Sequence, residues 1–183
     1  GKGFRVYTEK LDHRVSSFGY RVVEDSRPGE LLMSKLEKYN IPNGPLLGKL
    51  KKGEQIVLSD GTVLDGKEFL GPERPGRIVT IIYDTRSTPN IAKLAQNADV
   101  LVHESTFAGN EAKLAHSYYH STAVEAATVA RDNGVKRLYL DHISARYLGS
   151  KAKQLEKQAR KVFDHTKLVN DFDRVNIPMK GTD

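Results

Sequence analysis

Residues 78–170 alternate short apolar runs with segments of helical periodicity, and this alternation restricts the fold more than any other feature of the sequence. Residues 78–83 (Ile-Val-Thr-Ile-Ile-Tyr) form a continuous β-branched run that predicts a buried strand. Further strands are expected at 99–103, 137–142, 167–170 and 172–175, and helices at 89–97, 121–132 and 150–163. Alternating strands and helices of this kind predict an α/β layered fold.

Residues 27–77 differ from this pattern and hold five of the seven prolines. We expect a short helix at 31–39 and a hairpin formed by 55–58 and 62–64 around Asp60-Gly61. We interpret this segment as a small module that protrudes between two core strands, with a long surface loop as the alternative. The expected organisation is therefore a core from 1–26 and 78–183, interrupted by the module at 27–77.

The composition excludes several classes of protein. The chain has no cysteine, which excludes a disulfide scaffold, a thiol nucleophile and a Cys-ligated zinc or iron–sulfur site. No apolar run reaches the roughly 20 residues that a membrane helix needs, and the basic N-terminus is not followed by the apolar core of a signal peptide. We expect a soluble cytoplasmic protein with no membrane partner.

The net charge of +6 is unevenly distributed. Residues 78–130 are slightly acidic and contain several histidines, a combination that suits hard or borderline metal ions. Most of the basic excess lies between Arg146 and Lys161. That run is typical of a solvated helix face, and a phosphate-facing surface is the alternative.

Three expected strands end in side chains that could bind a metal: Asp84, His103 and His142. The carboxyl ends of neighbouring strands line the ligand crevice in open α/β sheets, so these residues are candidates for one site. Two further histidines are candidates. His13 precedes an expected turn at 16–20, and His120 precedes the helix expected at 121, where its imidazole would face the helix dipole.

Each histidine alone is more often structural than functional, and we assign no role to His116 and His165. Asp84 alone could simply cap a turn. Three strand ends in succession favour a shared site. His13, Asp84 and His142 are nevertheless too few for two metal ions about 3.5–4 Å apart, so we expect further ligands from outside this sequence.

Several short motifs together resemble the ribonuclease Z (tRNase Z) family of the metallo-β-lactamase superfamily, over essentially all 183 residues and as the larger C-terminal part of the family sequence. Leu11-Asp12-His13, Asp84-Thr85-Arg86 and the run from His142 to Tyr147 resemble three metal-binding motifs of the family. The segments His103-Glu104-Ser105-Thr106 and His120-Ser121-Thr122 resemble its His-Glu-Ala-Thr and His-Ser-Thr motifs. Residues 27–77, with Gly44-Pro45 and Gly48-Lys49, resemble its flexible arm.

Three departures from the family pattern stand out. Tyr83 replaces the usual Gly before Asp-Thr, and Ser105 replaces the usual Ala. The family's His-x-His-x-Asp-His motif does not occur in the sequence. We therefore expect an N-terminal lobe with most of the metal ligands to be missing.

The resemblance implies part of a metallo-β-lactamase αββα sandwich that binds two zinc ions and removes the 3′ trailer of precursor tRNA after the discriminator nucleotide, leaving a tRNA 3′-OH and a trailer 5′-phosphate. His13 and His142 would each bind one metal ion, and Asp84 would bridge them. His120 would be the general acid, oriented by Glu104. Substrate contacts are implied for Arg86, Arg146, Ser144, Lys49, Lys51 and Lys52. A homodimer is also implied.

Two other functions remain open. The chain could be a tRNA-binding fragment that does not cut, or part of a related phosphodiesterase of the same superfamily, although the arm argues against the latter. We expect the chain alone to be inactive or nearly so. Half of a sandwich would also expose a sheet face that the other half normally covers.

Overall fold

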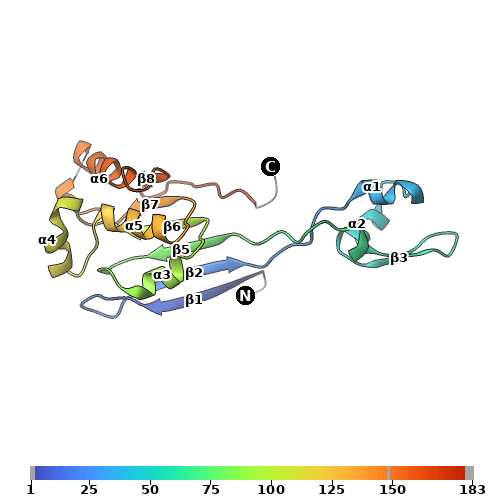
Figure 1. Cartoon of the computed structure of the whole chain (residues 1–183), viewed down its shortest axis with the longest axis horizontal. Coiled ribbons are helices and arrows are strands. Elements are labelled where there is room, and N and C mark those ends of the chain that lie inside the picture. The colour runs from blue at the N-terminus through green and yellow to red at the C-terminus, as the bar shows by residue number, and fades with distance from the viewer. Residues whose placement is uncertain (1–2, 148, 180–183) are drawn as a thin grey trace. The chain divides into compact units, whose positions relative to one another are not determined.

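The computed structural model describes residues 3–147 and 149–179, which form two compact units (Figure 1). The larger unit contains the chain up to Glu24 and from Arg77 to Met179. The smaller unit contains Asp25–Gly76. The smaller unit is therefore inserted between two neighbouring strands of the larger one.

The larger unit is built on a six-stranded sheet with the order β1-β2-β5-β6-β7-β8. Its strands are β1 (Phe4–Lys10), β2 (Phe18–Glu24), β5 (Ile78–Ile82), β6 (Val100–Glu104), β7 (Leu138–Asp141) and β8 (Thr166–Leu168). β1, β2 and β5 pair antiparallel, and β5 to β8 pair parallel. The expected α/β fold is confirmed, because helices connect the parallel strands.

Within the described residues, this unit has four α-helices: α3 (Pro89–Ala95), α4 (Ala112–Ser117), α5 (Ala123–Asp132) and α6 (Ser150–Arg160). The periodicity predicted α3, α5 and α6 but not α4. Thr122 is the N-cap of α5, and its hydroxyl and the Glu125 side chain form a capping box. The helix therefore begins two residues later than the sequence suggested.

Other expectations for this unit were wrong. Residues 172–175 form no strand, and Phe172 is fully exposed. The expected turn at 16–20 ends early, because β2 already begins at Phe18. β1 and β2 were not predicted at all, since the side chains of β1 are largely exposed on both faces and its apolar residues do not alternate cleanly with polar ones.

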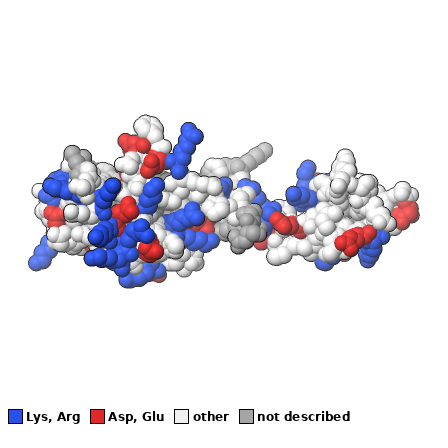
Figure 2. Space-filling view, turned by 90° about the horizontal axis from the view of Figure 1, so that it is seen from above, with Lys and Arg blue, Asp and Glu red and all other residues white. Residues whose placement is uncertain are grey.

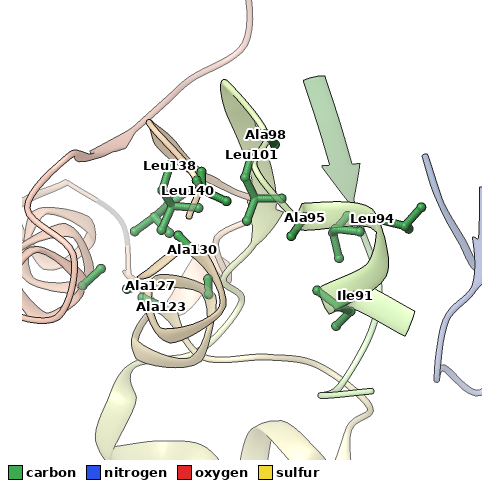
Figure 3. Close-up of a cluster of buried hydrophobic side chains, with 14 of the residues drawn as sticks. Ile91, Leu94, Ala95, Ala98, Leu101, Ala123, Ala127, Ala130, Leu138 and Leu140 are labelled. Carbon is green, nitrogen blue, oxygen red and sulfur yellow. The ribbon is translucent and has the colours of Figure 1, made fainter. Parts of the chain in front are cut away.

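The helices pack on one face of the sheet, where the main core lies (Figure 3). Ala123, Ala127 and Ala130 of α5 face Leu138 and Leu140 of β7. Their small side chains allow the helix axis to approach the sheet closely. On the same side, Ile91 and Leu94 of α3 join the core. A Cβ atom at Gly19 would lie 2.6 Å from Leu94 Cδ1, so a larger residue there would force this buried side chain to move.

The opposite face of the sheet leaves apolar side chains open to solvent. Phe4, Val6, Phe18 and Tyr20 share this face by their register in β1 and β2. Their exposed fractions run from 42% to 53%. The sheet is therefore covered by helices on one side only within the described residues, as expected for one half of a sandwich.

The smaller unit has its own core. It contains α1 (Met33–Leu36), α2 (Pro45–Lys51), a hairpin of β3 (Gln55–Val57) and β4 (Val63–Asp65), and two 3₁₀ turns at Glu37–Tyr39 and Gly66–Phe69. Leu36, Leu50, Ile56, Leu64 and Phe69 form its buried cluster. The predicted hairpin is confirmed, whereas the helix expected at 31–39 is a single α-helical turn followed by a 3₁₀ turn.

Among the described residues, no helix has both the length and the apolar character that crossing a membrane requires.

The separate core of the smaller unit leads to a prediction about local stability. Ile56 is 3% exposed, and the next residue, Val57, is 64% exposed. We expect Ile56→Ala to lower the free energy of unfolding of this unit by about 3 kcal/mol, because it leaves a cavity. Val57→Ala is the matched control and should cost less than about 1 kcal/mol.

Hydrogen exchange of backbone amides in 25–76 measures both effects. Equal losses of protection for Ile56→Ala and Val57→Ala would contradict the packing described here.

Candidate functional site

The carboxyl ends of three neighbouring parallel strands meet at one edge of the sheet. Asp84 follows β5, Glu104 ends β6 and His142 follows β7. Asp84 and His142 both have left-handed backbones, with φ values of 42° and 54°. In this arrangement Asp84 Oδ1 lies 3.1 Å from His142 Nε2.

His120 completes a cluster that could hold a metal ion. One ligand atom each from Asp84, His120 and His142 lie within 4.8 Å of one another. A carboxylate and two imidazoles form a donor set that suits zinc or manganese. The cluster is half-buried, and His142 is its most exposed member, so a ligand can reach it from solvent.

The Glu104 carboxylate organises the loops around this cluster and is fully buried. One oxygen, Oε1, accepts hydrogen bonds from Thr85 N, Ser121 N and His120 Nδ1 at 3.0, 3.1 and 2.9 Å. The other, Oε2, accepts from the backbone N and the hydroxyl of Thr106 at 3.1 and 2.8 Å. With Nδ1 directed at this carboxylate, the His120 ring leaves Nε2 for the site.

His120 does not face the α5 dipole as the sequence suggested. Its Nδ1 contacts Glu104 and the Thr106 hydroxyl, the latter at 3.3 Å, while Thr122 caps the helix. The orientation of His120 is therefore set by the end of β6 rather than by the helix N-terminus.

His13 lies beside the cluster but is not one of its three members. It comes from the turn between β1 and β2, and its ring centroid is 5.1 Å from that of His120. Its Nδ1 lies 3.0 Å from the Tyr119 carbonyl oxygen. A donor bond to that carbonyl leaves Nε2 of His13 free to bind another group.

His103 is not at the site, contrary to the expectation from its place at a strand end. β6 continues to Glu104, so His103 lies one residue earlier and faces the core. It is 1% exposed, its Nδ1 contacts the Glu104 carbonyl oxygen, and its Nε2 has no hydrogen-bond partner among the described residues. Burial lowers the pKa of His103, because the charged imidazolium is poorly solvated there.

Tyr83 and Asp141 are further residues of this edge, and the sequence predicted no role for either of them. The Tyr83 hydroxyl donates to Asp141 Oδ2 at 2.5 Å. Burial raises the pKa of Tyr83, and the hydrogen bond and negative charge of Asp141 act in the same direction. The only sequence signal was their position, since they directly precede Asp84 and His142.

The arginines expected to contact substrate are engaged in ion pairs. Arg86 Nε lies 2.7 Å from Asp12 Oδ2, and its guanidinium lies over the Tyr119 ring at 4.3 Å. Arg146 is 2.9 Å from Glu111. Both arginines are nevertheless partly exposed, so a phosphate could compete for them.

Ser144 and the three lysines lie on different parts of the chain. Ser144 helps to line a cavity of about 520 Å³ together with Asp141 and Tyr147. Lys49 and Lys51 lie on α2 of the smaller unit, and Lys52 is its C-cap. All three lysines are exposed, as contacts with an RNA backbone require.

The basic run after Arg146 falls largely on α6. Lys151, Lys153, Lys157 and Arg160 are exposed on this helix. Lys and Arg side chains gather on the face of the larger unit that Figure 2 shows. Glu156 turns inward and accepts a hydrogen bond from the Leu168 backbone N of β8 at 2.9 Å, so it does not offset this positive surface fully.

Comparison with known proteins identifies close relatives. No family model matches the sequence. The chain is 73% identical over 182 residues to ribonuclease Z of Lactobacillus helveticus, which covers 100% of this chain and 58% of that relative. It is 55% identical over 178 residues to ribonuclease Z of Limosilactobacillus reuteri, and the match covers 97% of this chain and 58% of that relative. The resemblance to ribonuclease Z is thus confirmed, and the chain spans a little over half the length of these curated relatives.

Solved structures agree on the fold. Human tRNase Z, short form, aligns with a TM-score of 0.57 and 25% identity, covering 97% of this chain and 45% of that one. A metallo-β-lactamase fold protein from Bacillus subtilis aligns with a TM-score of 0.57 and 18% identity, and the alignment covers 92% of this chain and 48% of that protein. The expected fold class, part of a metallo-β-lactamase sandwich, is confirmed.

The buried His103 leads to a prediction about pH. Its pKa is lower in the folded than in the unfolded chain, so the unfolded chain binds more protons below its unfolded pKa of about 6.5. His103 therefore contributes a loss of stability as the pH falls below about 6.5, with a slope of up to about 1.4 kcal/mol per pH unit.

We expect His103→Leu to flatten the fall in unfolding free energy between pH 6.5 and 5.5, measured by urea titration. His165 is exposed, and His165→Leu is the control that should keep the slope. An unchanged slope in His103→Leu would show that the His103 imidazole is not the source of the stability loss at low pH.

Proposed function

We propose that this chain is the C-terminal part of a zinc-dependent endoribonuclease that removes the 3′ trailer of precursor tRNA. The observation that carries this proposal is the cluster of Asp84, His120 and His142 at one sheet edge, in a chain with 73% identity to a protein named ribonuclease Z. Relatives of that name cut RNA, and the cluster supplies groups for phosphodiester hydrolysis.

The donor set fits the metal ions that this function needs. Asp84 and His142 would hold zinc together with His13, whose ring centroid lies 5.1 Å from that of His120. Residues of the relatives that this chain does not cover would supply the remaining ligands. When bound, the ions supply Lewis-acid stabilisation of the phosphoryl oxygens and a lowered pKa of water.

His120 is proposed to protonate the leaving 3′ oxygen. Hydrolysis adds water at phosphorus and breaks the bond from phosphorus to the 3′ oxygen of the discriminator nucleotide, which then needs a proton. Glu104 holds His120 Nδ1 at 2.9 Å, so Nε2 can carry and donate that proton. The products are a tRNA with a free 3′-OH and a trailer with a 5′-phosphate.

The smaller unit is proposed to bind the body of the tRNA. Lys49, Lys51 and Lys52 gather positive charge in and just after α2, and RNA backbones are bound by charge and shape. Arg86 and Arg146 are proposed to contact phosphates near the cluster.

A tRNA-binding role without cleavage is the alternative for the chain alone. The chain covers 58% of its relatives and offers only Asp84, His142 and His13 as proposed metal ligands within the described residues. Two ions need more ligands than these. Cleavage assays with the chain and with the full-length protein distinguish the two roles.

The role of His120 can be tested in the full-length protein. We expect His120→Ala to lower kcat for precursor tRNA by about 100-fold or more, because the leaving oxygen loses its acid. Zinc content, measured by mass spectrometry, should stay unchanged. The control is His116→Ala, because His116 is an exposed residue paired with Glu125. Loss of zinc in His120→Ala would make His120 a ligand instead.

The role of the smaller unit can be tested by charge removal. We expect the triple variant Lys49→Ala, Lys51→Ala, Lys52→Ala to weaken precursor tRNA binding and to reduce the slope of log affinity against log salt by about 2. The comparator removes Lys151, Lys153 and Lys157 of α6. A larger loss in the α6 variant would move the main RNA contact to the larger unit.

A further inference from the structure

A hydrogen bond from the Tyr83 hydroxyl to Asp141 joins the ends of β5 and β7, directly before Asp84 and His142. We call this bond the clasp. We infer that this hydrogen bond positions the two metal-binding residues, so that Tyr83 is a positioning residue for the metal site. The inference rests on the metal site of the proposed function. It goes beyond that function because it assigns a role to two residues that do not themselves bind the metal.

The clasp spans the strand between them. β5 pairs with β6, and β6 pairs with β7. Tyr83 directly follows β5 and Asp141 ends β7, so the two residues belong to strand ends two positions apart in the sheet. The backbones of such strands are roughly 9.5 Å apart. A phenol is long enough to cross this distance and to donate at its end, which neither Gly nor Ser could do. The hydroxyl oxygen reaches Asp141 Oδ2 at 2.5 Å.

Asp141 transmits the clasp to His142 through its second oxygen. Asp141 Oδ1 accepts a hydrogen bond from the His142 backbone N at 2.8 Å. The Asp141 carbonyl oxygen accepts from Ser105 N at 2.9 Å, which fixes it to the end of β6. Tyr83 is covalently joined to Asp84, so one chain of contacts runs from Asp84 to His142.

Tyr83 and Asp141 each directly precede a residue with a strained backbone conformation. Asp84 and His142 adopt positive φ, a conformation that costs free energy for residues other than glycine. Such conformations persist only where surrounding contacts hold them. The clasp supplies these contacts on both sides of the 3.1 Å approach between Asp84 Oδ1 and His142 Nε2.

The test uses Tyr83→Phe in the full-length protein, because this change removes only the hydroxyl. We expect the zinc affinity, measured by competition with a chromogenic chelator, to fall about 10-fold. The absorption spectrum of bound Co²⁺ should change as well, while the KM for precursor tRNA stays constant. Tyr139→Phe is the matched control, since Tyr139 is half-buried on β7 and its hydroxyl makes no hydrogen bond within the described residues.

A double-mutant cycle then tests the partner. Tyr83→Phe should cost nothing further in an Asp141→Ala background, because the bond is already lost. Unchanged zinc affinity and Co²⁺ spectrum in Tyr83→Phe, or equal losses in Tyr139→Phe, would overturn the inference. If Asp141→Ala does not fold, as judged by circular dichroism, the two tyrosine variants decide alone.

Metal titration does not depend on RNA cleavage. A protein that fails to cut precursor tRNA would defeat the proposed function, while the Tyr83→Phe titration would still decide the role of the clasp.

Discussion

The buried carboxylate of Glu104 is the contact on which the rest of the site depends. It is fully buried and accepts five hydrogen bonds from Thr85, Thr106, His120 and Ser121. These donors belong to the segment after β5, the end of β6 and the loop before α5. A buried carboxylate is tolerated only when such donors surround it, so its burial and the loop positions require each other.

The parallel sheet and this carboxylate together explain why the functional groups converge. Parallel pairing brings the ends of β5, β6 and β7 to one edge, which places Asp84, Glu104 and His142 in a row. His120 joins this row because Glu104 holds its Nδ1 and thereby directs Nε2 outward. The sheet supplies the approximate positions, and the hydrogen bonds supply the orientations.

The sequence predicted the strands and helices between 78 and 160, except α4, because their apolar residues face one packed core with clear periodicity. It failed for β1 and β2, whose side chains are largely or partly exposed. It singled out Asp84, His120 and His142, which the structure brings together, yet it also grouped His103 with them. Side chains along a strand alternate between the two faces of the sheet. Because β6 ends at Glu104, one residue later than predicted, Glu104 rather than His103 reaches the site. Periodicity does not fix the end of a strand to within one residue. The Tyr83–Asp141 bond joins residues 58 positions apart, which no local pattern predicts.

The exposed sheet face and the small number of candidate metal ligands have a common explanation under the proposed function. The face that carries Phe4, Val6, Phe18 and Tyr20 is the one that a second layer covers in a complete αββα sandwich. Burying such side chains stabilises a protein by about 1.5–3 kcal/mol each, so a second layer would be held strongly. In a sandwich the same layer brings its own strand ends to the edge where Asp84 and His142 lie. Under the proposed function, the layer that covers the apolar face would therefore also supply the remaining metal ligands.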